Sequence, residues 1–208
     1  MLTEKVEPIW ADTTAIVAAS GPSLTPQVAA LVRASSAFVI AVNDAFRMLP
    51  SADVLYAADL AWWQMHDDTR AFEGERWSSH STDQGFADDK SDSALGLYLV
   101  AARAGAGFSS NAQYVHYGET PHSGFQAVNL ALLFGARRVI LVGFDMRRVG
   151  GRSHFFGEHP RGLRRDSDYA GFIAAYSPHP RVLNATPGSA LDCFERVDLV
   201  AAINQRPQ

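Results

Sequence analysis

The chain is poor in cysteine, in lysine and in long apolar runs. Its one cysteine, Cys193, excludes an internal disulfide and a metal site built from several thiolates. No apolar run reaches the ~18–20 residues that a membrane-spanning helix needs. The first ten residues lack the basic stretch and apolar core of a signal peptide. We therefore expect a cytoplasmic protein without a membrane span.

Positive charge is also scarce. The 208 residues contain 18 Lys and Arg against 22 Asp and Glu, a net charge of −4. Because duplex-binding proteins are normally basic, we expect no duplex nucleic acid as a partner. Of the basic residues 16 are Arg and 2 are Lys. A GC-rich genome explains this bias, and so does phosphate binding, for which the Arg guanidinium is well suited.

Length and composition predict one folded domain over residues 1–208, because 47% of the residues are hydrophobic and domains usually span about 100–200 residues. Short apolar runs between turn residues predict strands at 15–19, 38–42, 54–58, 97–101, 113–117, 139–142 and 181–184. Helical patterns lie between them at 24–34, 60–67, 124–134, 168–176 and 194–203. This alternation predicts an α/β fold, a Rossmann-like three-layer sandwich with a mostly parallel sheet.

Local signals refine this prediction. Thr25 followed by Pro26 is typical of a helix start, and Ser123 with Gln126 has the spacing of a capping box. Residues 78–93 have little to bury, which predicts a mobile insertion. Residues 143–168 form a long irregular stretch with six Arg, which predicts a functional loop.

Polar residues follow several of the predicted strands, namely Asn43, Asp44, Asp59 and Asp145. In open α/β sheets ligands bind beyond the carboxyl ends of the strands, so we expect these side chains around one nucleotide pocket. The alternative is that they only form turns, for which Asp and Asn are favoured.

Two glycine-containing helix starts are candidate phosphate sites. Gly21, Pro22 and Ser23 join the first strand to the first helix, and Ser123 and Gly124 open another helix. Glycine allows close backbone approach, and helix N-termini favour anions. Neither segment has the glycine pattern of a dinucleotide-binding loop or a P-loop.

The Arg-rich stretch contains two histidines, His154 and His159, either of which could act as general base for a hydroxyl. A metal held by both is the less favoured alternative, because their spacing is not that of a helical metal-binding pair. Arg147 and Arg152 are candidate phosphate contacts, with a solvated surface as the alternative.

Trp62 and Trp63 could stack on a base, although core packing or a subunit interface in a homo-oligomer is the commoner role for tryptophan.

Taken together, four motifs resemble a phage and prophage family of small proteins: V-A-A-S-G-P-S-L, A-V-N-D, the segment from H-S-G-F-Q to V-G-F-D-M, and H-F-F-G-E-H-P. That family is similar to the domain family of the archaeal 6-hydroxymethyl-dihydropterin diphosphokinase and to the Campylobacter-type bacterial sialyltransferases. The resemblance covers roughly residues 14–200.

The resemblance to the sialyltransferases implies that Gly21, Pro22, Ser23 and Asn43 hold the nucleotide of a CMP-sugar. It implies the same contact for Ser123 and Gly124 and a general-base role for His154. In those enzymes tyrosines beside the G-x-D motif stabilise the leaving phosphate. Here the neighbours of Asp145 are Phe144 and Met146, and the next tyrosine is Tyr169. The resemblance to the diphosphokinase implies Mg²⁺ at Asp44, Asp59 and Asp145.

We therefore expect a nucleotide-dependent transferase that moves a glycosyl group from a nucleotide sugar to the hydroxyl of an unidentified acceptor. The catalytic candidates are His154, His159 and Asp145. One alternative is a Mg²⁺-dependent diphosphotransferase of the pterin type. Another is a non-catalytic phage accessory protein that binds a nucleotide or a host partner.

Overall fold

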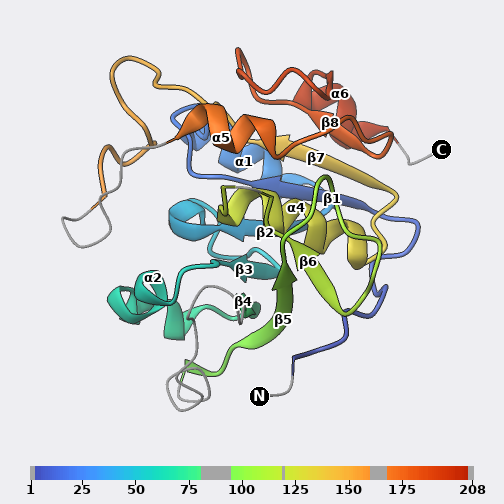
Figure 1. Cartoon of the computed structure of the whole chain (residues 1–208). Helices are drawn as coiled ribbons and strands as arrows, with labels where there is room; N and C mark the ends of the chain where they lie inside the picture. Colours follow the sequence, from blue (N-terminus) through green and yellow to red (C-terminus); the bar gives the residue numbers. More distant parts are fainter. Residues whose placement is uncertain (1–2, 81–94, 119, 160–167, 206–208) are drawn as a thin grey trace.

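The computed structural model describes residues 3–80, 95–118, 120–159 and 168–205. In these residues nine strands form one sheet in which every neighbouring pair is parallel, in the order β6-β5-β4-β3-β2-β1-β7-β8-β9 (Figure 1). The strands are β1 (Thr14–Ala18), β2 (Phe38–Val42), β3 (Val54–Tyr56), β4 (Glu75–His80), β5 (Tyr98–Arg103), β6 (Tyr114–His116), β7 (Arg138–Val142), β8 (Val182–Asn184) and β9 (Glu195–Arg196).

Helices cover both faces of this sheet, which confirms the predicted Rossmann-like three-layer α/β fold. One face packs against α4 (Ser123–Leu133), beside which lies α5 (Tyr169–Ala174). The other face packs against α1 (Pro26–Ala34), α2 (Leu60–Met65) and α6 (Leu199–Asn204). Two 3₁₀ turns, η1 (Asn43–Arg47) and η2 (Asp67–Ala71), follow β2 and α2.

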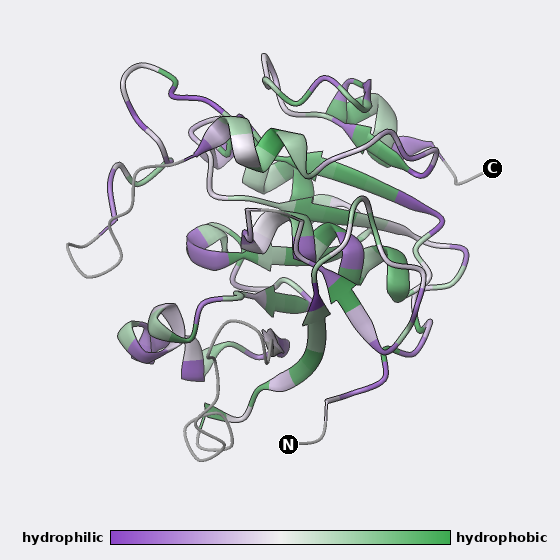
Figure 2. Ribbon diagram, in the orientation of Figure 1, coloured by the Kyte–Doolittle hydropathy of each residue, from purple (hydrophilic) through white to green (hydrophobic). Residues whose placement is uncertain are grey.

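The central strands are apolar on both faces because each face contributes to a separate core. In β1, Ala15 and Val17 belong to the core on the α4 side, whereas Ile16 and Ala18 belong to the core on the α1 side. Figure 2 shows the same distribution, with hydrophobic colour along the central strands and hydrophilic colour mostly in loops and helix surfaces. Such double burial is what parallel sheets require.

Helix α4 lies inside the protein, since all eleven of its residues are buried. One side of it packs on the sheet, and the other is covered by segments from both ends of the chain, including Trp10 and Phe194. A helix that is apolar nearly all round is typical of such a buried position. The position of α4 is therefore fixed by packing along its length.

The order of the strands reverses beside β1. The chain adds β2 to β6 outward in one direction, returns through α4, and then adds β7 to β9 on the other side of β1. The loops that follow β1 and β7 therefore leave the sheet toward opposite sides. This arrangement opens a crevice at the carboxyl ends of these two strands, where ligands bind in open α/β sheets.

The structure corrects the predicted mobile insertion at residues 78–93. Ser78–His80 belong to strand β4, and the buried Ser78 hydroxyl donates a hydrogen bond to the Ala57 carbonyl at 2.8 Å. Serine suits this position because the neighbouring backbone supplies the acceptor. Residues 81–93 lie outside the described residues. The short strand β9 was also not predicted, and it occupies part of the predicted helix 194–203.

The capping prediction holds for α1 and fails for α4. Thr25 caps α1 by accepting a hydrogen bond from the Val28 N–H, and Pro26 is its first residue. In α4 the cap is His122, whose Nδ1 accepts from the Phe125 N–H at 3.3 Å. Ser123 is already helical, so its hydroxyl is free to bond another segment.

Candidate functional site

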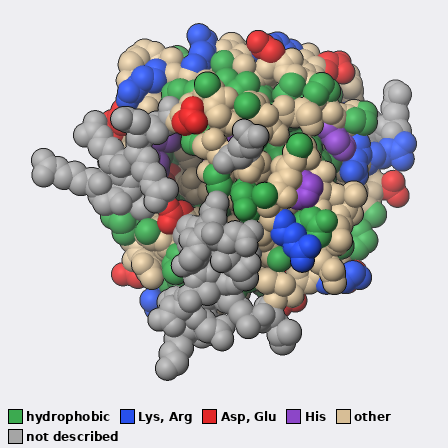
Figure 3. All heavy atoms as spheres, in the orientation of Figure 1, with side chains coloured by type: hydrophobic (Ala, Val, Ile, Leu, Met, Phe, Trp, Pro, Cys, Tyr) green, Lys and Arg blue, Asp and Glu red, His purple; other side chains and the backbone are tan. Residues whose placement is uncertain are grey.

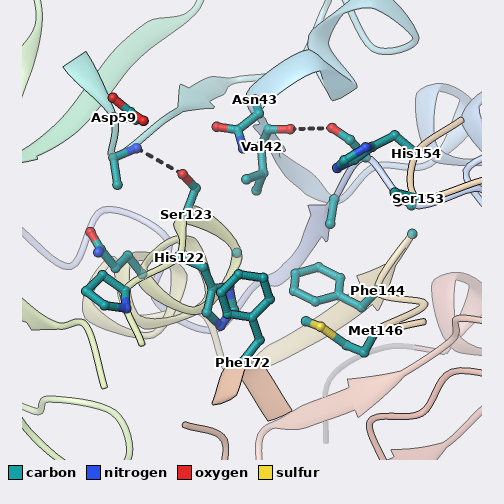
Figure 4. Close-up of a pocket in the computed structure, with 18 of the residues that line it drawn as sticks. Val42, Asn43, Asp59, His122, Ser123, Phe144, Met146, Ser153, His154 and Phe172 are labelled. Carbon is teal, nitrogen blue, oxygen red and sulfur yellow. Dashed lines mark hydrogen bonds between the residues drawn. The ribbon is translucent and has the colours of Figure 1, made fainter. Parts of the chain in front are cut away.

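A cavity of about 320 Å³ lies at the carboxyl ends of the strands, next to the reversal of strand order. It is lined by the segments that follow β1, β2, β3 and β7, by the start of α4, and by parts of the 143–159 loop and of α5. Figure 4 shows Asn43, Ser123 and His154 around this space, with Phe144, Met146 and Phe172 forming an apolar part of its wall.

Of the thirteen residues predicted from the sequence, nine line the cavity. They are Gly21, Asn43, Asp59, Ser123, Gly124, Asp145, Arg147, His154 and His159. The other four predicted residues, Pro22, Ser23, Asp44 and Arg152, are not part of the lining. Most of the predicted residues therefore line the cavity, although they form only part of its lining.

Gly21 fits between the loops that follow β1 and β7. A Cβ atom at this position would lie 2.1 Å from the Asp145 Oδ2 and 2.3 Å from the Gly143 carbonyl oxygen. Glycine is therefore required here by the packing of the two loops. This requirement is independent of any ligand.

Ser23 reaches Asp145 and not the cavity. Its backbone N–H and its hydroxyl donate hydrogen bonds to Asp145 Oδ2, at 3.2 and 2.7 Å. The Asp145 side chain thereby ties the start of α1 to the end of β7. The carboxylate of Asp145 is 3% exposed, and its Oδ1 atom makes no hydrogen bond with a described residue.

Asn43 follows β2 in a left-handed conformation, with φ +50°. Asparagine tolerates this region better than most residues because its short amide bonds locally. Just before it, the Val42 carbonyl accepts a hydrogen bond from the Ser20 hydroxyl at 3.0 Å (Figure 4). This bond joins the ends of β1 and β2 and fixes Asn43 at the rim of the cavity.

Asp44 lies behind the cavity wall, contrary to the expected place among the polar side chains of the pocket. Its carboxylate accepts from the Trp62 indole N–H at 3.0 Å and from Arg47 Nε at 3.3 Å, and it lies 3.3 Å from His66 Nε2. The turn η1 directs Asn43 and Asp44 to different sides, and Asp44 is 5% exposed. Asp44 therefore belongs to a polar cluster with Trp62, Arg47 and His66.

Both tryptophans of α2 are buried in the core, and Trp62 also lines the cavity. Trp62 and Trp63 are 3% and 1% exposed, and the Trp63 indole N–H donates to the Ala57 carbonyl at 2.9 Å. Trp62 stacks on His66 with ring centroids 4.3 Å apart. Asp59, which lines the cavity, caps the same helix by accepting from the Ala61 N–H at 2.9 Å.

The N-terminus of α4 faces the cavity. The Ser123 hydroxyl accepts a hydrogen bond from the Ala58 N–H at 3.0 Å (Figure 4), which ties the helix start to the end of β3. The cap from His122 is used by Phe125, so the backbone N–H groups of Ser123 and Gly124 are left at the positive end of an eleven-residue helix. This is a suitable seat for an anionic group.

His122 was not predicted as a site residue. Burial lowers its pKa to about 3, against a smaller opposing effect of the Phe172 backbone, so its imidazole is neutral at neutral pH. Because Nδ1 accepts from the Phe125 N–H, the ring proton resides on Nε2, which has no hydrogen-bond partner among the described residues. Its place directly before a helix start is the only sequence signal that could have identified it.

His154 and His159 come together in the 143–159 loop, with ring centroids 4.4 Å apart. Phe156 lies parallel to the His154 ring at 5.0 Å. Burial lowers the pKa of both histidines, and the neighbouring His159 lowers that of His154 further. The Nδ1 atoms of both rings are buried without a hydrogen-bond partner in the described part of the chain.

The arginines of this loop differ in position. Arg147 lines the cavity and packs over Gly188, where a Cβ would lie 2.7 Å from its Nη2. Arg152 closes a tight turn with Val149, and Arg148 pairs with Glu158. The remaining three arginines, Arg161, Arg164 and Arg165, lie outside the described residues. On the face drawn in Figure 3, Lys and Arg side chains occur in separate small groups.

Two further residues of the wall could not be read from the sequence. Tyr169, at the start of α5, lines the cavity, and its hydroxyl is buried without a partner in the described residues. Met146 adopts a left-handed conformation with φ +51°, which is unfavourable for a long side chain. Strained residues of this kind concentrate at functional sites.

The three carboxylates expected to carry Mg²⁺ do not form a common site. Asp44 bonds to Trp62 and Arg47 behind the wall, whereas Asp59 and Asp145 line the cavity. Across residues 3–80, 95–118, 120–159 and 168–205, no three His, Cys, Asp or Glu side chains are grouped as metal ligands. The expected trio therefore does not fit Mg²⁺ as it stands.

No helix within the described ranges combines the length and hydropathy of a membrane span. Comparisons with protein-family models, with curated proteins and with solved structures gave no match to this chain.

Proposed function

We propose that this protein is a nucleotide-dependent transferase that moves a glycosyl group from a nucleotide sugar to the hydroxyl of an acceptor. One observation carries the proposal: a free helix N-terminus, an arginine and a neutral histidine line the same cavity at the reversal of strand order. The four sequence motifs resemble a phage and prophage family that is similar to the sialyltransferases, and this resemblance supports the same assignment.

The donor phosphate binds at the start of α4. The backbone N–H groups of Ser123 and Gly124 and the guanidinium of Arg147 provide hydrogen-bond donors and positive charge. A helix N-terminus stabilises an anion by about 0.3–1 kcal/mol when exposed, and by up to about 2 kcal/mol when partly buried. The latter range applies, because every residue of α4 is buried.

His154 accepts the proton of the acceptor hydroxyl. Its lowered pKa keeps the imidazole neutral, and its Nδ1 has no competing partner among the described residues. The acceptor oxygen forms a bond to the anomeric carbon as its proton passes to His154. The bond between that carbon and the phosphate oxygen breaks, and the nucleoside phosphate leaves with the electron pair. Positioning and stabilisation of the leaving phosphate supply the remaining rate acceleration.

The distribution of charge favours a donor with one phosphate over a diphosphate or triphosphate. Arg147 is the one Lys or Arg among the described lining residues, and it shares the cavity with Asp59 and Asp145. A nucleoside triphosphate needs Mg²⁺ to bridge its phosphates, and the expected carboxylate trio does not form one site. These observations support glycosyl transfer over diphosphoryl transfer.

The test is calorimetric titration with CMP, CDP, ATP and UDP-sugars in the presence of Mg²⁺ or of EDTA. We expect a nucleoside monophosphate to bind equally well in both buffers. Binding of ATP that is abolished by EDTA would favour diphosphoryl transfer. Absence of binding by every nucleotide at millimolar concentration would overturn both functions.

A further inference from the structure

The cavity has a second, largely uncharged end that the proposed chemistry does not use. It lies at the ends of β4, β5 and β6, where the lining includes Ser79, Ala102 and Tyr117, together with Gln126 of α4. The charged and catalytic candidates Asp145, Arg147 and His154 belong to the segments after β7, and Asp59 follows β3. A ligand that fills the cavity therefore meets mainly neutral groups at this end.

A buried chain of hydrogen bonds connects Ser79, Tyr56 and Gln126 at this end of the cavity. The Tyr56 hydroxyl donates to Gln126 Oε1 at 2.6 Å, and Ser79 bonds to the Tyr56 oxygen. Tyr56 is 0% exposed and Gln126 is 2% exposed, although Gln126 still lines the cavity. Burial raises the pKa of Tyr56 above its ordinary value, so its hydroxyl remains a donor at any working pH.

The hydrogen bond from Tyr56 fixes the orientation of the Gln126 amide. Because Oε1 accepts from Tyr56, the NH₂ group points away from that tyrosine, and it has no hydrogen-bond partner among the described residues. Because Gln126 lines the cavity, its NH₂ group is available there to a ligand that supplies an acceptor.

Asn129, one turn later in α4, is a buried amide whose oxygen and NH₂ group both have partners. Its Oδ1 accepts from the backbone N–H groups of Ser109 and His116, both at 2.9 Å, and its NH₂ group donates to the Ser109 carbonyl at 2.9 Å. Asn129 thus has a structural role and does not line the cavity. Gln126 differs from it in both respects.

We propose that the Gln126 amide is a specificity-determining donor that recognises an uncharged oxygen, a carbonyl or a hydroxyl, on a ring of the bound ligand. An uncharged oxygen that can accept this hydrogen bond is present both in the carbonyl of a pyrimidine base and in the hydroxyls of a sugar ring. Tyr56 is the positioning residue that holds the amide in this orientation. The proposal rests on the proposed function in one respect: the proposed function identifies the molecule that carries the ring as a nucleotide sugar.

The experiment follows the side-chain NH₂ signals of Gln126 by NMR in ¹⁵N-labelled protein, assigned by their absence in Gln126→Leu. The probes are inorganic phosphate, cytidine, uridine, CMP and the methyl glycosides of common hexoses. We expect the signals to shift with a nucleoside or with a glycoside, which identifies the source of the ring, and to stay in place with phosphate alone. The NH₂ signals of exposed Gln27 and of satisfied Asn129 serve as internal controls.

The outcomes separate this proposal from the proposed function. Binding of CMP without movement of the Gln126 signals would overturn the specificity role and leave the nucleotide site intact. A response to glycosides without any nucleotide binding would support the role of Gln126 and contradict the proposed function. If no neutral ring compound moves the signals, the proposal is wrong.

Affinity measurements on variants complete the test. Gln126→Leu should weaken binding of the responsive ligand about tenfold, because one hydrogen bond to a neutral group is lost. This change removes the acceptor of the Tyr56 hydroxyl proton. The double variant Tyr56→Phe/Gln126→Leu removes that buried donor as well and tests the same loss of the amide. Tyr56→Phe alone should weaken binding less, about threefold, because the amide remains but is less well oriented. Unchanged affinity in the double variant would overturn the proposal.

Discussion

The carboxylate of Asp145 accepts two hydrogen bonds from Ser23, a residue 122 positions earlier in the chain. One comes from the Ser23 backbone N–H and the other from its hydroxyl. These two hydrogen bonds hold the loop after β1 against the loop after β7, at the place where the strand order reverses. The shape of the cavity beside them depends on this contact.

Replacement of Ser23 by alanine removes the shorter of the two hydrogen bonds to a buried carboxylate. We expect Ser23→Ala to lower the free energy of unfolding by about 1.5–3 kcal/mol, the usual value for a bond to a charged group. Urea denaturation measures the change. Since Ser23 does not line the cavity, ligand affinity should fall less than threefold, and a larger fall with unchanged stability would contradict this role.

Gly21 should not tolerate a side chain. In Gly21→Ala the new Cβ would lie 2.1 Å from Asp145 Oδ2 and 2.3 Å from the Gly143 carbonyl. We expect the variant to lose about 2–3 kcal/mol of stability, because one of these atoms is backbone that cannot give way cheaply. Gly150→Ala is the control: its Cβ would meet nothing within 4 Å, and its positive φ costs only about 1 kcal/mol. Equal stability of the two variants would disprove the packing argument.

Replacement of His154 tests whether this residue acts in turnover and not in nucleotide binding. His154→Ala should leave nucleotide affinity within about twofold and reduce turnover at least ~100-fold, as expected for loss of a general base. Calorimetry and a coupled assay for the released nucleoside phosphate measure the two quantities. A variant that binds and turns over like the wild type would favour the non-catalytic alternative.

The neutral, buried His122 makes stability depend on pH. Its pKa is lowered from 6.5 to about 3 on folding, so the unfolded chain binds the proton more tightly. The corresponding stability is present above pH 6.5 and is lost as the pH falls toward 3. Linkage predicts a loss of about 2 kcal/mol between pH 7 and pH 5 from this group alone. In His122→Asn, which retains a capping side chain, the difference between urea denaturation at the two pH values should shrink by that amount.

The two candidate phosphate contacts in the 143–159 loop should behave differently. Arg147→Gln should weaken binding of a nucleoside monophosphate about tenfold and reduce its dependence on salt, because a charge-assisted contact in the cavity is lost. Arg152→Gln is the matched control and should change affinity less than twofold, since Arg152 does not line the cavity. Calorimetry at two salt concentrations distinguishes them, and equal effects would contradict the assignment of Arg147.

Much of the fold could be predicted because the central strands are short apolar runs between turn residues. Val139 to Val142 is one such run, and it forms most of β7. Strand β4 was missed because Ser78 and Ser79 interrupt its apolar pattern. Their hydroxyls are satisfied by partners far away in the sequence, Ala57 and Tyr56, which no local pattern reveals.

The candidate site was predictable in outline, since strand ends and helix starts must meet at one edge of a parallel sheet. The direction of individual side chains was not. Asn43 and Asp44 are adjacent, yet the left-handed conformation of Asn43 and the turn after it place one at the cavity and the other against Trp62. In α4 the sequence shows two amides, Gln126 and Asn129, and only their contacts distinguish a structural amide from one with a free donor.

Strand β7 lies more than a hundred residues after β1 in the sequence, and this separation matters while the chain is being synthesised. Strand β1 pairs with β7 along its whole length, from Thr14 to Ala18, and β7 begins only at Arg138. Until the ribosome has released that segment, the apolar edge of β1 has no neighbour on this side, and open strand edges invite association with other chains. A nascent chain shorter than about 140 residues therefore carries an unpaired edge of β1 through which it can associate with other chains.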